Sequence, residues 1–99
     1  MEHILNIGLE QRQWLLLRQM VDSKRTKNMK SGLTNALTLL FRTPPGEYPR
    51  ARKYPKTKYM SLRIEESLHL KLRQLESAGH ILSKQDGIDR ALRLLFQTN

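Results

Sequence analysis

The sequence predicts a mostly α-helical protein with a short two-stranded antiparallel ribbon, in which two tandem strand-helix-helix repeats fold together as a pseudo-dimer. Three observations lead to this fold class. The chain of 99 residues contains an internal repeat without gaps, each copy changes from a strand-like to a helix-like apolar pattern, and a proline-rich segment separates the copies. The expected order of elements is therefore β-α-α-linker-β-α-α.

The internal repeat aligns residues 3–41 with residues 58–96 at a constant offset of 55 positions. Eleven of the 39 aligned pairs are identical, and five more keep an apolar side chain in both copies. An ungapped alignment of this length indicates a duplication. We expect a first repeat at 1–41, a linker at 42–57 and a second repeat at 58–99. The two repeats are expected to share one core, because neither is large enough to bury a core alone.

Each repeat opens with apolar residues at every second position, which is the pattern of a half-buried strand. A lone strand has no hydrogen-bonding partner inside its own repeat, so we expect the two strands to pair antiparallel. The sequence leaves open whether they pair within one chain or between two chains. The side chains expected to face the core are Leu5, Ile7, Leu9, Met60, Leu62 and Ile64, and those expected to face outward are Ile4, Asn6, Gly8, Tyr59, Ser61 and Arg63.

Two helices are expected after each strand, because apolar residues then recur at helical spacing. The second helix of each repeat follows a break and begins at Asn28 or at Ser83, where Asp86 completes a capping-box pattern. Equivalent glycines in the second helices, Gly32 and Gly87, indicate close helix–helix approach or simple inheritance from the duplication. The leucines of both repeats, together with Trp14, Phe41 and Phe96, are expected to form the core.

The linker between the repeats reads RTPPGEYPRARKYPKT and holds all four prolines and five basic residues. Proline at this density predicts extended chain without a helix. The basic residues of the linker therefore have two interpretations, contact with a phosphate backbone or plain solvation. The candidates for such contact are Arg50, Arg52, Lys53 and Lys56.

The composition limits the class of function. A formal net charge of +9 and a pI of about 10.4 favour a polyanionic partner, either nucleic acid or an anionic membrane surface. The absence of cysteine excludes disulfides, thiolate metal sites and a cysteine nucleophile. No apolar run approaches the ~18 residues of a membrane span, and no basic segment opens a signal peptide, so we expect a cytoplasmic protein.

The sequence offers no catalytic or cofactor motif. His3, His69 and His80 lack metal-ligand spacing, and no nucleophile–base set or glycine-rich phosphate loop is recognisable. We therefore expect no enzyme activity, no cofactor and no metal site.

The segments KYMSLRIEES, LHLKLRQLESAG and SKQDGIDRALRLLF resemble the ribbon-helix-helix family, which includes Arc- and MetJ-like repressors. The resemblance covers both repeats, about four-fifths of the chain. It implies that the ribbon enters the major groove of double-stranded DNA and that the second helices grip phosphate with their N-termini. The implied base contacts are Asn6, Tyr59, Ser61 and Arg63, and the implied phosphate contacts are Asn28, Lys30, Ser83 and Lys84. Ile4 and Gly8 depart from the family, which usually has long polar side chains there, and this weakens readout by the first repeat.

A sequence-specific transcriptional regulator or repressor is the expected function, with self-association of copies on adjacent sites as a means of raising affinity. The alternative is an accessory DNA-binding protein of a plasmid conjugation complex, the relaxosome, with a relaxase as partner, because some such proteins have a similar fused form. An antitoxin-type interaction module is less favoured, because the chain ends soon after the last expected helix. Membrane binding is also less favoured, because a shared core explains the leucine faces better.

Overall fold

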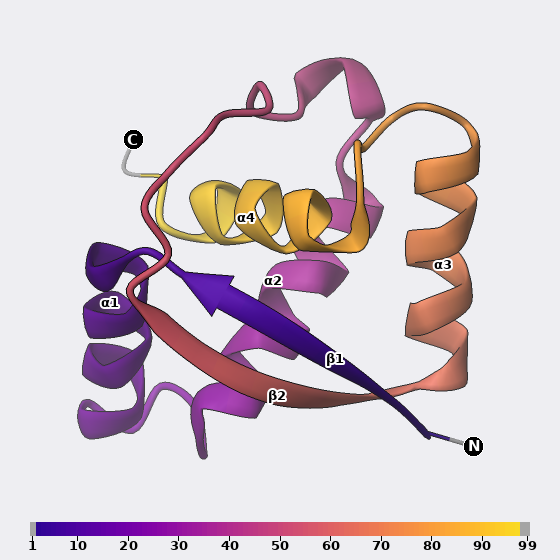
Figure 1. Cartoon of the computed structure of the whole chain (residues 1–99). Helices are drawn as coiled ribbons and strands as arrows, with labels where there is room; N and C mark the ends of the chain where they lie inside the picture. Colours follow the sequence, from indigo (N-terminus) through magenta and orange to yellow (C-terminus); the bar gives the residue numbers. More distant parts are fainter. Residues whose placement is uncertain (1, 98–99) are drawn as a thin grey trace.

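Each half of the chain forms one strand followed by two helices, in the same order. The structure is a computed structural model and describes residues 2–97. Its elements are β1 (Glu2–Leu9), α1 (Gln11–Asp22), α2 (Met29–Arg42), the 3-10 helix η1 (Pro45–Glu47), β2 (Lys58–Glu65), α3 (Glu66–Ser77) and α4 (Lys84–Leu95). Figure 1 shows α1 and α3 at opposite ends of the ribbon, with α2 and α4 packed behind it.

The expected layout is corrected in its middle. We predicted a linker without a helix, but Pro45–Glu47 form one turn of 3-10 helix, so the order is β-α-α-η-β-α-α. A proline at the first position of a helix loses no hydrogen bond, because that N–H has no partner in the helix, and its fixed φ suits the turn. Proline density therefore excludes a long helix but not this single turn.

The two strands, β1 and β2 of the single chain, pair antiparallel. Asn6 lies opposite Ser61 at the centre of the ribbon, and Gly8 lies opposite Tyr59. The alternation of the sequence gives the ribbon an inner face against the helices and an outer face toward solvent.

The repeats coincide in structure as well as in sequence. Helix α3 begins and ends 55 residues after α1, and α4 begins 55 residues after α2. The turn between the helices also repeats its backbone, because Lys24 and Gly79 both have positive φ, 63° and 79°. Asn28 and Ser83 each cap the helix that follows, accepting hydrogen bonds from Ser31 N–H at 2.9 Å and Asp86 N–H at 3.0 Å.

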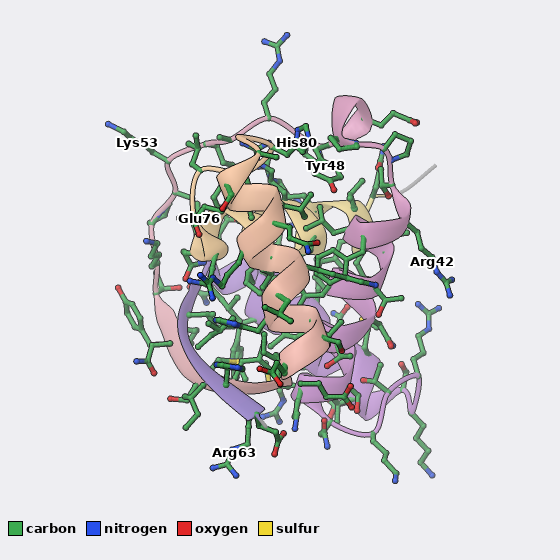
Figure 2. All side chains as sticks on the ribbon, turned by 90° about the vertical axis from the view of Figure 1, so that its right-hand side faces the viewer. Arg42, Tyr48, Lys53, Arg63, Glu76 and His80 are labelled. Carbon is green, nitrogen blue, oxygen red and sulfur yellow. The ribbon has the colours of Figure 1, made fainter. Side chains whose placement is uncertain are left out.

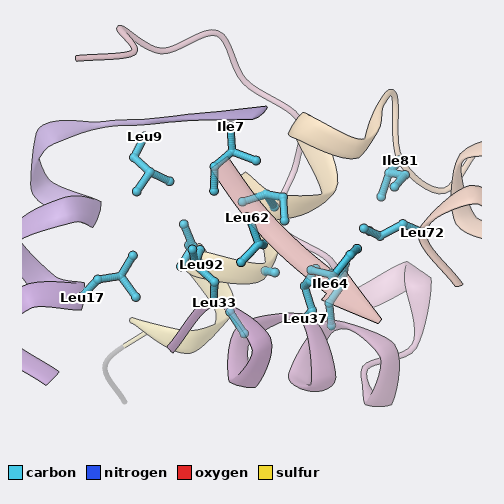
Figure 3. Close-up of a cluster of buried hydrophobic side chains, with 14 residues drawn as sticks. Ile7, Leu9, Leu17, Leu33, Leu37, Leu62, Ile64, Leu72, Ile81 and Leu92 are labelled. Carbon is cyan, nitrogen blue, oxygen red and sulfur yellow. The ribbon is translucent and has the colours of Figure 1, made fainter. Parts of the chain in front are cut away.

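One hydrophobic core joins both repeats (Figure 3). Each fully buried Leu or Ile stabilises the fold by about 1.5–3 kcal/mol. Most of the buried residues occur as equivalent pairs, one from each repeat: Ile7 and Leu62, Leu9 and Ile64, Leu17 and Leu72, Leu33 and Ile88, Ala36 and Ala91, and Leu37 and Leu92.

The expectation that all the leucines are core is wrong, because three are exposed and two more, Leu16 and Leu39, are half-buried outside the core cluster. Leu15 and Leu70 occupy equivalent positions on α1 and α3 and are 47% and 46% exposed. Leu82, in the segment between α3 and α4, is 72% exposed. Trp14, Phe41 and Phe96 are partly buried and pack against the core. Four consecutive residues span more than a full helical turn, so the apolar run Trp14–Leu17 cannot direct every side chain inward.

The two helical glycines mark close helix–helix contacts. A Cβ added at Gly32 would lie 2.9 Å from Leu17 Cδ2, and one added at Gly87 would lie 3.1 Å from Leu72 Cδ2 and 2.8 Å from Ile81 Cδ1. Each glycine therefore lets a leucine of the preceding helix pack directly on the backbone of the second helix.

Candidate nucleic-acid interface

The outer face of the ribbon brings together the four residues expected to contact bases. Asn6 and Ser61 are joined by a hydrogen bond of 3.0 Å in which Ser61 Oγ donates to Asn6 Oδ1. Tyr59 is 74% exposed. Arg63 is exposed as well and projects away from the body of the protein in Figure 2. All four side chains are thus free to meet a partner on one surface.

The outer face differs between the two repeats. In the alignment of the two repeats, Ile4 is equivalent to Tyr59, Asn6 to Ser61, and Gly8 to Arg63. Ile4 is 60% exposed, so an apolar side chain occupies solvent where repeat 2 has a phenol. The surface is therefore pseudo-symmetric in backbone and asymmetric in chemistry.

One end of the outer face is acidic, which sequence reasoning missed. Glu2 and Glu65 lie directly opposite each other in the ribbon, and both are exposed. Like charges in this arrangement repel each other and any phosphate nearby. Lys30 is one of the expected phosphate contacts. Its Nζ lies 3.6 Å from Glu2 Oε2, and both side chains are about half exposed. An ion pair this exposed is weak, so Lys30 is readily available to another anion.

The other expected phosphate contacts lie at the starts of α2 and α4. The side chains of Asn28 and Ser83 are engaged as helix caps, which leaves other backbone N–H groups of the first turn without a helical partner. Lys84 is half-buried. Burial lowers the pKa of the His69 imidazole, and the charges of His3 and Lys84 lower it further. Lys30 and Lys84 do not occupy equivalent positions, because Lys84 aligns with Met29.

The four basic residues proposed for the linker have different environments. Arg50 is exposed, and its carbonyl oxygen accepts a hydrogen bond from Arg93. Arg52 forms ion pairs with Glu10 and Asp89. Lys53 extends into solvent in Figure 2. The aliphatic part of Lys56 lies against Gly8 of the ribbon. The linker is therefore attached to the fold rather than free.

Asp89 anchors the linker, and sequence reasoning missed it. Its carboxylate is fully buried on α4 and accepts hydrogen bonds from Gln13 Nε2 at 2.8 Å and Arg52 Nη2 at 3.0 Å, and pairs with Arg93 at 2.9 Å. The hydrogen bond with Asp89 raises the pKa of Arg52 further, which keeps it charged. Arg52 also reaches Glu10 at 3.1 Å. The signal in the sequence was an acid inside the apolar stripe of α4, next to Ile88.

A second polar cluster ties the linker to the edge of β1. Gln85 mimics a neighbouring strand, because its Oε1 accepts from Gly8 N–H at 2.7 Å and its Nε2 donates to Gly8 carbonyl at 3.0 Å. The same Nε2 lies 2.7 Å from the hydroxyl of Tyr54, which itself donates to the Gly8 carbonyl at 3.2 Å. Burial raises the pKa of Tyr54, so its hydroxyl stays a neutral donor.

The described residues contain no cluster of three or more His, Cys, Asp or Glu side chains able to hold a metal ion. His3 and His69 stack face to face with ring centroids 3.9 Å apart. Over residues 2–97, no helix is both long and apolar enough to cross a membrane. In comparisons with known proteins, no family, curated protein or solved structure matched this chain.

Proposed function

We propose that this protein binds double-stranded DNA in a sequence-specific manner, with the outer face of the β1–β2 ribbon in the major groove, and acts as a transcriptional regulator. The observation that carries the proposal is the outer face itself. Every outer position except Gly8 is exposed, and polar side chains from both strands meet there at the centre of the ribbon. This is the arrangement found in ribbon-helix-helix proteins, which the sequence resembles.

The dimensions and charge of the ribbon support this function. The major groove is about 12 Å wide and admits a two-stranded ribbon, whose strands lie about 4.8 Å apart. Arg63 can donate two hydrogen bonds to guanine, and Asn6 can pair with adenine. The net charge of +9 supplies a long-range attraction for a polyanion. Because the two repeats differ on the outer face, we expect a target with two unlike halves.

Selection from a random duplex library at ~150 mM salt tests the proposal, since nonspecific phosphate binding is weak there. We expect enrichment of a short, asymmetric motif. The variant Arg63→Ala should bind that motif more weakly by ~1–3 kcal/mol and show a relaxed preference in one half. Binding without any motif, or an unchanged motif with Arg63→Ala, would refute readout by the ribbon.

The genomic position of the enriched motif separates two roles for the same DNA binding. A motif in promoters supports a transcriptional regulator. A motif confined to an origin of plasmid transfer would instead support an accessory role beside a relaxase.

A further inference from the structure

Gly8 is a gap in the outer face of the ribbon, and its equivalent in the other repeat is Arg63. A symmetric ribbon would place a long cation at each of these positions. The backbone of β1 at Gly8 is related by the symmetry of the ribbon to that of β2 at Arg63, but Gly8 carries no side chain. The chain nonetheless brings a cation to this point from a distant segment.

The side chain of Lys56 occupies the space that a side chain at position 8 would take. A Cβ built on Gly8 would lie 2.7 Å from Lys56 Cδ and 3.0 Å from its Cβ and Cγ. The first separation is shorter than a carbon–carbon contact allows, and the other two are tight. A side chain at position 8 would therefore have to displace Lys56, whose aliphatic part packs directly on the strand.

Lys56 is held in place by its neighbours along the linker. Thr57 N–H donates to the Leu9 carbonyl at 2.9 Å, which extends the pairing of the ribbon by one residue. The ammonium of Lys56 lies 5.8 Å from the centroid of the Tyr54 ring. Tyr54 is fixed in turn by its hydrogen bonds with Gln85 and Gly8. A cation restrained in this way loses little conformational freedom when it binds an anion.

Lys56 also lies near Asn6 and Ser61, the opposed pair at the centre of the outer face. It lines a shallow hollow with Asn6, Tyr59, Ser61 and Gln85. Within residues 2–97, no carboxylate forms an ion pair with Lys56, whereas Arg52 in the same linker is paired with two. The charge of Lys56 therefore lies beside the outer face without an acidic partner among the described residues, and it is available to an anion there.

We propose that Lys56 is the DNA-contacting cation of the β1 half, supplied by the linker as the counterpart of Arg63 in the β2 half. The inference rests on the proposed DNA binding. It assigns to the linker a part in recognition in addition to its part in joining the repeats. The readout by the first repeat is therefore stronger than the bare sequence of β1 indicates.

The test uses the full chain and the motif selected by the wild-type protein. Lys56→Met removes the charge and keeps the aliphatic packing on Gly8, so the melting temperature should not change. Lys71→Met is the matched control, because Lys71 also lies over an aromatic ring, that of Phe41 at 5.5 Å, but on α3. We expect Lys56→Met to lose affinity roughly tenfold and Lys71→Met to lose little.

Targets with one half scrambled then locate the contact. Wild-type protein should lose affinity for either scrambled target. Lys56→Met should become less sensitive than wild type to scrambling of one half, and Arg63→Met less sensitive to scrambling of the other. The inference is overturned if Lys56→Met binds like wild type, if it couples to the same half as Arg63→Met, or if it couples to neither. A wild-type protein that selects no motif would fail earlier and overturn the proposed function itself.

Discussion

Asn6 and Ser61 lie directly opposite each other in the ribbon, and they are the same position of the two repeats. Only one position of an antiparallel pair of equivalent strands can be paired with its own equivalent, and a two-fold axis passes through it. The hydrogen bond between their side chains therefore marks the pseudo-two-fold axis of the molecule. The strand register and the sequence alignment agree on this centre of symmetry.

This symmetry predicts the behaviour of an isolated repeat. A fragment of residues 1–45 retains β1, α1 and α2 but loses its partner strand and half of each buried pair. We expect it to be unfolded when dilute, and to form a homodimer at higher concentration with Asn6 opposite Asn6. Circular dichroism and sedimentation over a range of concentrations test this. A folded monomer at low concentration would contradict the shared core.

Much of the backbone was predictable from the sequence, because the duplication supplies every element twice. A break marked clearly in one copy, such as Gly79, identifies the less obvious break in the other copy at Lys24. The path of the linker was not predictable. It depends on contacts such as Arg52 with Asp89, which lie 37 residues apart and show no local periodicity. Lys56 was foreseen as a linker cation, but its place on Gly8 was not.

Asp89 should be the polar residue whose loss destabilises the fold most. Asp89→Asn keeps the size of the side chain but leaves Arg52 and Arg93 beside a neutral amide. Removing one partner of a buried pair costs ~3–5 kcal/mol, and we expect about 2–3 kcal/mol because both arginines are partly exposed. Urea unfolding measures the loss. Glu2→Gln is the control, because its exposed pair with Lys30 should contribute less than ~1 kcal/mol. Equal losses in the two variants would disprove the anchoring role.

The two helical glycines should respond differently to alanine. In each case alanine gains about 1 kcal/mol of helix propensity and introduces a steric conflict. Gly32 meets one leucine methyl, whereas Gly87 meets both Leu72 and Ile81. We expect Gly32→Ala to be close to neutral and Gly87→Ala to destabilise by ~1 kcal/mol or more. Thermal unfolding of both variants compares them directly, and a stabilising Gly87→Ala would show that the packing there is loose.

Lys24 has a backbone conformation that favours glycine. Its φ of 63° is left-handed, and the equivalent residue of repeat 2 is Gly79 with φ of 79°. The left-handed region costs a residue with a Cβ about 1–2 kcal/mol, offset in part by the greater chain entropy of glycine. We therefore expect Lys24→Gly to stabilise by ~0.5–1 kcal/mol and Gly79→Ala to destabilise. Chemical denaturation distinguishes them, and destabilisation by Lys24→Gly would mean that the lysine side chain contributes more than its backbone costs.

The stacked imidazoles of His3 and His69 should make stability depend on pH. The positions equivalent to His3 and His69 are Lys58 and Trp14, and these also meet across the two repeats. The Lys58 ammonium lies 4.9 Å from the centroid of the Trp14 ring. Burial lowers the pKa of His69 below its ordinary 6.5, and the charges of His3, Lys84 and Arg73 lower it further, against a smaller opposite effect of Glu66.

The direction of this pH dependence follows from where protons bind. Above pH 6.5 His69 is neutral in both the folded and the unfolded chain and has no effect on the free energy of unfolding. As the pH falls below 6.5, the unfolded chain takes up the proton first, so the folded state loses stability until its own lowered pKa is passed. We expect the midpoint of urea unfolding to fall between pH 7 and pH 5, and His69→Phe, which keeps an aromatic ring on His3, to remove part of that fall. His80→Phe is the control, because His80 is exposed in the turn before α4. If both variants keep the wild-type slope, the stacked pair does not control the response to acid.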